Sequence, residues 1–191
     1  MNALENWFCS TAFWRHTTQA RLLPWIFSGL RLGDHVLEIG AGLGAATREL
    51  RRRASRVASL EYDARFSAEL RCIEGRCGDF VVRGDGAALP FADCTFSSAV
   101  AILVLHHLSS RDLQDRAFAE IHRILRPGGH FFGFEINDGW LHRTIHKNST
   151  FVPLLSASVP ARLSHAGFSP VTVDCRRGGF AIRAGRARDA A

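Results

Sequence analysis

VLEIGAGLGAAT, residues 36–47, is the stretch of sequence that decides the fold. A short apolar run meets Gly40, Gly42 and Gly44, and helix-forming residues follow at once, which predicts a strand, a tight turn and a helix. Glycine reaches backbone angles that other residues avoid, and its missing side chain lets a ligand lie against the main chain. In an open α/β sheet, ligands bind at this position, beyond the carboxyl end of a strand. We therefore expect a ligand site here.

The spacing of these glycines indicates which ligand to expect. A dinucleotide fingerprint reads Gly-x-Gly-x-x-Gly, whereas this turn reads Gly-x-Gly-x-Gly and follows Glu38. A carboxylate repels a pyrophosphate and attracts a cation, such as the sulfonium of S-adenosylmethionine (SAM). The string from Glu38 to Gly44 resembles the first motif of class I SAM-dependent methyltransferases. The resemblance implies that Glu38, Gly40, Ala41, Gly42 and Gly44 bind SAM.

A second strand is expected at residues 56–60, and it ends on Glu61-Tyr62-Asp63. Glu61 comes 17 residues after Gly44, where an acid can accept hydrogen bonds from both ribose hydroxyls. Asp63 is placed to cap the next helix, and Tyr62 could pack on the ribose or the adenine edge. The alternative for Glu61 is a solvated strand end without a ligand.

A third strand is expected at residues 80–83, followed by Gly-Asp-Gly-Ala-Ala-Leu-Pro-Phe at residues 84–91. This segment resembles the matching segment of the small-molecule branch of the same family, the methyltransferase type 11-like branch. There the acid accepts a hydrogen bond from the adenine amine, which implies this role for Asp85, with Gly86 beside it. The alternative is that Asp85 only stabilises a turn.

The unbroken apolar run at residues 96–105 predicts a central strand that is buried on both faces. It would deliver Leu103 to the cofactor, with His106 and His107 at the same edge of the sheet. Imidazole titrates near neutral pH, so His106 is the candidate general base. Family members often have a histidine at the second position whether or not they need a base. No metal is expected, because no acid or cysteine lies close by in the sequence.

The second half of the chain predicts the closing elements of the same sheet. The sequence from Glu120 to Gly129 resembles the family's turn after the long helix that is expected at residues 111–125. The expected elements are a helix at 111–125, a turn at 126–129, a strand at 130–136, a helix at 158–166 and a hairpin of strands at 170–175 and 179–184. Segment 137–156, which contains both apolar and polar side chains, could cover an acceptor pocket.

The N-terminal residues 1–31 are expected to form a helical cap or lid, and residues 32–191 the methyltransferase domain. Residues 1–20 carry four large aromatic side chains: Trp7, Phe8, Phe13 and Trp14. These rings either pack on the core or form a lid over cofactor and substrate. A helix is expected at residues 17–30, with Pro24 causing a kink or marking a helix start nearby.

Composition limits the classes of protein that fit. The 191 residues suit one domain, and no apolar run approaches the ~20 residues of a membrane helix. The five cysteines are scattered and include no C-x-x-C pair, which disfavours a disulfide framework or a zinc site. Because the sequence also has no recognisable secretory signal, we expect a cytoplasmic protein. The net charge of +6 comes almost entirely from dispersed arginines, since Lys147 is the only lysine. This dispersion makes a nucleic-acid partner unlikely.

These observations predict one Rossmann-like, doubly wound α/β sheet of seven strands, with helices on both faces and a C-terminal antiparallel hairpin. The resemblance implies in-line methyl transfer from SAM to a small molecule (a quinone, phenol or lipid amine), with S-adenosylhomocysteine as product. Two alternatives remain. RNA methylation would use the basic charge, but the Asn/Asp-Pro-Pro-Tyr/Phe motif is missing after the fourth strand. The chain could also be a non-catalytic SAM-binding partner subunit. Its oligomeric state is not predicted.

Overall fold

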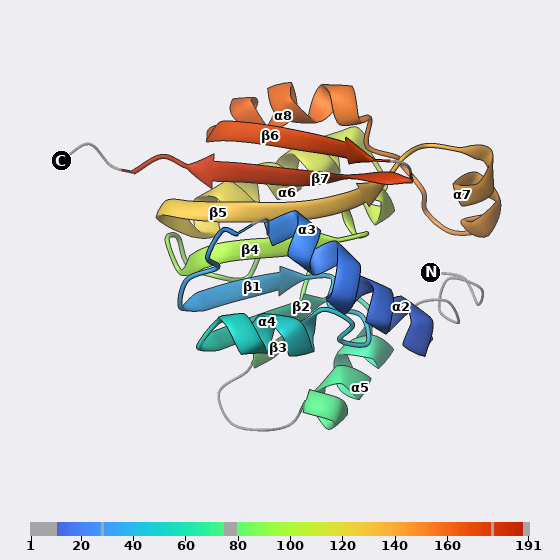
Figure 1. Cartoon of the computed structure of the whole chain (residues 1–191), viewed down its shortest axis with the longest axis horizontal. Helices are drawn as coiled ribbons and strands as arrows, with labels where there is room; N and C mark the ends of the chain where they lie inside the picture. The colour runs from blue at the N-terminus through green and yellow to red at the C-terminus, as the bar shows by residue number, and fades with distance from the viewer. Residues whose placement is uncertain (1–10, 28, 75–79, 177, 189–191) are drawn as a thin grey trace.

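Seven strands form one sheet in the computed structural model, which describes residues 11–27, 29–74, 80–176 and 178–188. The spatial order of the strands is β3-β2-β1-β4-β5-β7-β6 (Figure 1). The strands are β1 (His35–Ile39), β2 (Arg56–Glu61), β3 (Phe80–Arg83), β4 (Phe96–Ile102), β5 (Leu125–Ile136), β6 (Phe168–Arg176) and β7 (Gly179–Arg186). The pairs from β3 to β5 are parallel, and β7 pairs antiparallel with both β5 and β6. The predicted seven-stranded sheet and its terminal hairpin are confirmed.

The strand order reverses between β1 and β4. From β1 the chain adds β2 and β3 on one side, and it then crosses to the other side for β4 and β5. The carboxyl ends of β1 and β4 therefore form a topological switch point, and open α/β sheets bind ligands in the crevice at such a point. The glycine-rich turn follows β1, and His106 and His107 follow β4.

Helices cover both faces of the sheet, as predicted. The helical segments are α2 (Ala12–Thr17), a π-helical turn η1 (Thr18–Leu22), α3 (Leu23–Phe27), α4 (Thr47–Arg53), α5 (Ala64–Glu74), η2 (Leu105–His107), α6 (Arg111–Ile124), α7 (Trp140–Ile145), η3 (Ser156–Ser158) and α8 (Val159–His165). No helix in the described ranges is long and apolar enough to cross a membrane.

Alternate residues of β5 serve the two hydrophobic layers. Phe132 packs in the layer with α3 and α4, and Phe131 packs in the layer with α6 and α8. Successive side chains of a strand point to opposite faces, so the consecutive phenylalanines fill both layers. The apolar runs of the central strands are explained by this burial on two faces.

Several boundaries differ from the prediction, and two of them lie at residues with unusual backbone geometry. β4 ends at Ile102 rather than at residue 105, because Leu103 has a φ of 55° and leaves the extended conformation. The predicted turn at residues 126–129 is instead a bulge inside β5, since Leu125 pairs with Phe96 and His130 already pairs with Ser98. The chain therefore passes from α6 directly into β5.

The N-terminal helix runs from Ala12 to Phe27, not over the expected residues 17–30, and it contains one wide turn. The π-helical segment at residues 18–22 immediately precedes the turn that holds Pro24. Proline lacks the N–H of the helical ladder and its ring crowds the preceding carbonyls, so a wider turn relieves both problems. Phe13 is 71% exposed and does not pack on the core, while Trp7 and Phe8 lie outside the described residues. The lid remains a prediction.

Arginines of the C-terminal hairpin cap two helices. The Arg183 guanidinium donates hydrogen bonds to the carbonyls of Trp25 and Ile26, at the end of α3, both at 2.6 Å. Arg186 donates to carbonyls of residues 122, 123 and 125 at the end of α6. Cations stabilise the negative end of a helix. The charge of these arginines therefore has a structural use on both faces of the sheet.

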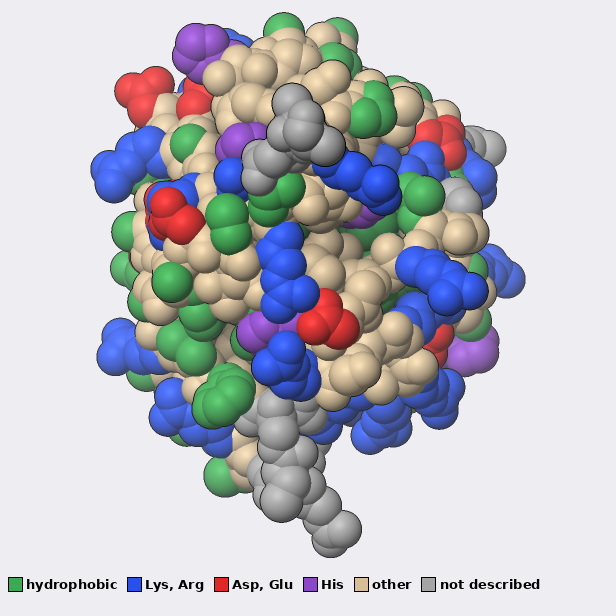
Figure 2. All heavy atoms as spheres, turned by 90° about the vertical axis from the view of Figure 1, so that its left-hand side faces the viewer, with side chains coloured by type: hydrophobic (Ala, Val, Ile, Leu, Met, Phe, Trp, Pro, Cys, Tyr) green, Lys and Arg blue, Asp and Glu red, His purple; other side chains and the backbone are tan. Residues whose placement is uncertain are grey.

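Basic side chains are also prominent at the amino ends of the parallel strands. Figure 2 shows this face, where blue Lys and Arg side chains predominate over red acidic ones. Here Asp34 pairs with Arg56 at 3.3 Å and with Arg126 at 2.7 Å, and Arg126 contributes to a lowered pKa of the Asp34 carboxyl. This face lies at the opposite end of the strands from the crevice.

Arg123 joins α6 to the loop before β4, and its loss is expected to destabilise the fold. Its guanidinium donates to the carbonyls of Leu89 (3.1 Å) and Phe91 (2.8 Å) and to the Glu120 carboxylate (2.8 Å). Because charge-assisted hydrogen bonds are lost, Arg123→Ala should lower the free energy of unfolding by about 1–3 kcal/mol in urea denaturation. Arg116→Ala removes the same charge from an exposed position of α6 and is the control. Equal stability of the two variants would contradict the assignment.

The same contact predicts a pH dependence of stability. The hydrogen bond from Arg123 lowers the pKa of Glu120 below its ordinary value of 4.5. Folding therefore gains stability from this carboxylate above about pH 4.5, and the gain is lost as the pH falls through the lowered pKa. The stability difference between the natural chain and Arg123→Ala should shrink in that acidic range.

Candidate active site

The glycine-rich turn connects three strands at the crevice. The N–H groups of Gly40 and Ala41 donate to the carbonyl of Leu60 at 2.8 and 3.1 Å, which joins the turn to β2. A Cβ on Gly40 would lie 2.2 Å from a methyl of Val104, so only glycine permits the turn to approach the loop after β4. Gly42 has a φ of 54°, and a Cβ there would meet nothing within 4 Å. The backbone at Gly42 thus faces open space.

Glu61 links this turn to the end of β2. One carboxylate oxygen accepts from the Gly42 N–H at 2.8 Å and the other from the Asp63 N–H at 2.8 Å. The side chain is only 8% exposed. Each oxygen has a second lone pair, so hydroxyl donors can still be accepted. Glu61 therefore lies at the end of the second strand, as predicted, and its contact with the ribose remains a prediction.

The two residues after Glu61 have the different surroundings that the sequence predicts. Asp63 caps α5, since its side chain accepts from the Arg65 N–H at 2.8 Å, and this bond lowers the pKa of the Asp63 carboxyl. Tyr62 is 72% exposed, so its ring is accessible to a ligand.

Gln19 of the N-terminal helix donates to the carbonyl of Ala45 at 3.1 Å, which places that helix against the glycine-rich turn.

Glu38 has a structural contact that the sequence interpretation missed. Its carboxylate is buried and accepts from the hydroxyls of Thr47 (2.6 Å) and Ser59 (3.1 Å). Thr47 begins α4, so Glu38 joins the strand before the glycines to the helix after them. A negative charge is favourable at this end of a helix. Its predicted attraction for a cationic ligand remains untested.

Asp85 and Gly86 lie beside the glycine-rich turn. Asp85 is exposed, and one of its carboxylate oxygens accepts from the Ala87 N–H at 2.8 Å in a tight turn. A Cβ on Gly86 would lie 3.4 Å from Ile39, the last residue of β1. The loop after β3 therefore reaches the mouth of the crevice, where the predicted adenine contact would form.

Leu103 redirects the chain as it leaves β4. Its φ of 55° is in the left-handed region, which is costly for a side chain of this size, and its N–H donates to the carbonyl of Phe134 at 2.9 Å. Residues held in such conformations often occur at functional sites. The short helix η2 follows and holds His106 and His107 at the carboxyl edge of the sheet.

His106 is buried and bound to a buried acid. Its Nδ1 lies 2.5 Å from an oxygen of Glu135, and these side chains are 3% and 1% exposed. The other oxygen of Glu135 accepts from the N–H groups of Val104 (3.1 Å) and Leu105 (2.8 Å). Glu135 therefore fixes both the loop after β4 and the ring of His106. Sequence reasoning missed Glu135, although an acid inside the apolar strand at residues 130–136 is a signal.

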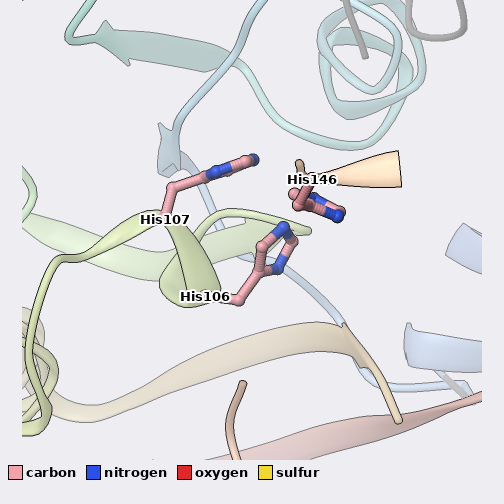
Figure 3. Close-up of side chains that lie close together, drawn as sticks. All are labelled: His106, His107 and His146. Carbon is pink, nitrogen blue, oxygen red and sulfur yellow. The ribbon is translucent and has the colours of Figure 1, made fainter. Parts of the chain in front are cut away.

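Two further histidines lie against His106. The ring centroids of His107 and His146 lie 4.2 and 5.1 Å from that of His106. Figure 3 shows the three rings turned toward a common space. The Phe151 ring stacks on His146 at 4.4 Å. His146 follows α7 in the segment expected to roof the acceptor pocket, so this segment does contribute to the edge of the crevice.

Comparison with known proteins identifies the family. A family model described as a methyltransferase domain matches residues 37–133, just over half of the chain. The chain belongs to this family. A demethylmenaquinone methyltransferase of Thermobifida fusca is 29% identical over 178 residues, which cover 82% of this chain and 72% of that protein. A probable tRNA methyltransferase 9B of Bos taurus is 32% identical over 135 residues, which cover 71% of this chain but only 28% of that protein.

Solved structures share the fold. The N-methyltransferase NodS of Bradyrhizobium japonicum, in complex with S-adenosylhomocysteine, superposes with a TM-score of 0.74 at 17% identity over 94% of this chain and 91% of that one. The protein is a SAM-dependent methyltransferase. The residues present fit this cofactor, because a Cβ on Gly42 would meet nothing within 4 Å and the Glu61 carboxylate beside it keeps lone pairs for further donors.

Asp85 offers a direct test of the cofactor site. Asp85→Ala should weaken SAM binding about tenfold or more, because one hydrogen bond to a charged acceptor is lost. Asp85→Asn keeps an oxygen for the Ala87 N–H but turns an amide N–H₂ toward the adenine amine, so it should bind as weakly as the alanine variant. Isothermal titration calorimetry measures both against Asp112→Ala, an exposed acid of α6. Full affinity in Asp85→Asn would contradict the predicted adenine contact.

Proposed function

We propose that this methyltransferase acts on a small aromatic acceptor that carries a hydroxyl group, such as a quinol or a phenol. The observation that carries the proposal is the buried pair of His106 and Glu135 at the carboxyl end of β4. Such a pair can take up the proton that a hydroxyl must lose to become a strong nucleophile. SAM, when bound, supplies the methyl group on a positively charged sulfur, and we assign its binding to the turn at residues 40–44, Glu61 and Asp85.

His106 is the residue that we propose to touch the acceptor. A carboxylate only accepts hydrogen bonds, so the Nδ1 that faces Glu135 carries the proton. In a neutral imidazole the lone pair then belongs to Nε2, which is the atom that would accept the acceptor proton. Glu135 holds the tautomer and the ring orientation, as the acid does in a serine–histidine–aspartate triad.

Large exposed apolar side chains on the segments that we propose to cover the acceptor support an aromatic acceptor. Trp140 of α7 is 79% exposed, Leu155 is 55% exposed, and Phe13 of α2 is 71% exposed. Both α7 and α2 lie toward the ends of the parallel strands where the crevice opens (Figure 1). We propose that residues 11–31 and 137–156 cover the acceptor and exclude water. The Thermobifida relative, named for demethylmenaquinone, is consistent with such a substrate.

Transfer of labelled methyl from SAM into a whole-cell extract tests the proposal. The extract is then separated into lipid, aqueous small-molecule and RNA pools. Label in the lipid or small-molecule pool would support a small acceptor, and label confined to RNA would overturn it in favour of the activity named for the bovine relative. SAM binding without label in any pool would favour a non-catalytic partner subunit. His106→Ala, which should transfer little label while still binding SAM, is the matched control.

A further inference from the structure

We propose that His106, His107 and His146 bind a divalent transition-metal ion of the zinc class. Each of the three rings offers one nitrogen, and these three nitrogens all lie within 4.8 Å of one another. Tetrahedral zinc with nitrogen ligands needs separations of about 3.3 Å, which small side-chain rotations can reach. The rings come from η2 and from the residue after α7, so the fold brings together ligands that are far apart in the sequence (Figure 3).

The second ring nitrogen of His106 and of His146 is held as metal-binding histidines require. A ligating imidazole usually donates its other N–H to a carboxylate or a backbone carbonyl, which fixes the tautomer and the ring orientation. Nδ1 of His106 faces the Glu135 carboxylate at 2.5 Å, and Nδ1 of His146 faces the carbonyl of His142 at 2.7 Å. Both acceptors are oxygens without a proton to donate, so both Nδ1 atoms carry hydrogen and the Nε2 atoms carry the lone pairs.

His107 follows the same pattern from a more accessible position. Its Nδ1 lies 3.2 Å from the carbonyl of Thr150, and its ring is half-buried whereas those of His106 and His146 are buried. An ion could therefore enter past His107. The stacked Phe151 ring gives the cluster an apolar wall, which strengthens metal–ligand interactions by excluding water.

The chemistry of the ligands indicates which ions fit. Three imidazoles suit Zn²⁺, Co²⁺, Ni²⁺ and Cu²⁺, whereas Mg²⁺ and Ca²⁺ require oxygen ligands. Three protein ligands leave a fourth position for an oxygen of water or of a substrate, as in catalytic zinc sites. The inference rests on the three rings and their partners and does not depend on the identity of the methyl acceptor. An ion at Nε2 and proton uptake by His106 would use the same lone pair, so His106 would serve as the base only in the metal-free protein.

Cobalt is the probe that tests the site, because four-coordinate Co²⁺ has an intense visible absorption. The full chain, stripped with a chelator, should bind one equivalent of Co²⁺ with this spectrum, Zn²⁺ should displace it, and Mg²⁺ should not. His107→Ala and His146→Ala should each abolish the spectrum. Glu135→Gln should weaken Co²⁺ binding by about 10- to 100-fold. His165→Ala, at an exposed position of α8, should leave it unchanged.

SAM binding is measured on every variant to show that the chain is folded. The readout of the metal test is the Co²⁺ spectrum, so its failure is distinct from a failure of the methyl-transfer test of the proposed function. His107 is only half-buried, so its variant keeps the test decisive if His146→Ala does not fold. The proposal is overturned if the natural chain gives no four-coordinate spectrum. It is also overturned if folded His107→Ala retains the spectrum, or if His165→Ala loses it equally.

Discussion

Glu61→Ala is expected to weaken SAM binding by at least about 30-fold, or ~2 kcal/mol, because hydrogen bonds to a charged acceptor are lost. The effect has two parts. The variant loses the carboxylate that we expect to accept the ribose hydroxyls, and it removes the partner of the Gly42 N–H at 2.8 Å. Without this partner the glycine-rich turn is less well held in the free protein, so part of the binding free energy of SAM would be used to order it. Isothermal titration calorimetry with S-adenosylhomocysteine measures the affinity without turnover.

Glu69→Ala is the matched control for this experiment, since it removes the same charge from an exposed position of α5. Glu61→Gln separates the two parts of the effect. Glutamine keeps one acceptor oxygen but presents N–H₂ to a backbone N–H, either that of Gly42 or that of Asp63. We therefore expect its affinity to fall nearly as far as that of the alanine variant. An affinity of Glu61→Ala equal to that of Glu69→Ala would show that the ribose site is misplaced.

Glu135→Ala is expected to lower the free energy of unfolding by about 3–5 kcal/mol, because removing one partner of a buried charged network leaves the others unpaired. Glu135 is buried and accepts from the N–H groups of Val104 and Leu105 and from the ring of His106. Its loss leaves these buried groups without their acceptor and creates a cavity. Urea denaturation measures the change.

Glu135→Gln should separate stability from catalysis. The amide oxygen can still accept from the Val104 and Leu105 N–H groups, so most of the stability should remain. The amide N–H₂ then faces Nδ1 of His106, which forces the opposite tautomer and places the proton on Nε2. Methyl transfer to a hydroxyl acceptor should fall, while SAM affinity stays unchanged. A fully active glutamine variant would exclude His106 as the base, and an alanine variant of natural stability would contradict the structural role of Glu135.

The sequence was sufficient to predict the fold because its signals are local. Three local signals each identify a strand end: the turn at residues 40–44, the acids at or just after the ends of β2 and β3, and the apolar run of β4. Parallel strands bring these ends to one edge. Most boundaries moved by one or two residues, and two moved because the backbone leaves regular geometry, at Leu103 and in the bulge at residues 126–129. Periodicity does not encode such departures.

The histidine site could not be predicted because its contacts are distant in the sequence. Glu135 lies 29 residues after His106, and His146 lies still further along the chain. The expectation of no metal rested on the lack of an acid or cysteine near these histidines in the sequence, and it stays untested. The fold brings Glu135 from β5 and His146 from beyond α7 next to His106, which the sequence could not show. The arginines of β7 were similarly ambiguous, since only the packed helices provide the carbonyls that they bind.

The position of β7 has a consequence for the order of events during synthesis on the ribosome. β7 follows the other six strands along the chain but lies between β5 and β6 in the sheet. Until Gly179 to Arg186 has emerged, β5 keeps an unpaired edge that carries Phe131, Phe132 and Phe134, and α3 and α6 lack their capping arginines. Unpaired apolar edges are templates for aggregation. Nascent chains stalled before β7 should therefore depend on chaperones far more than the finished protein does.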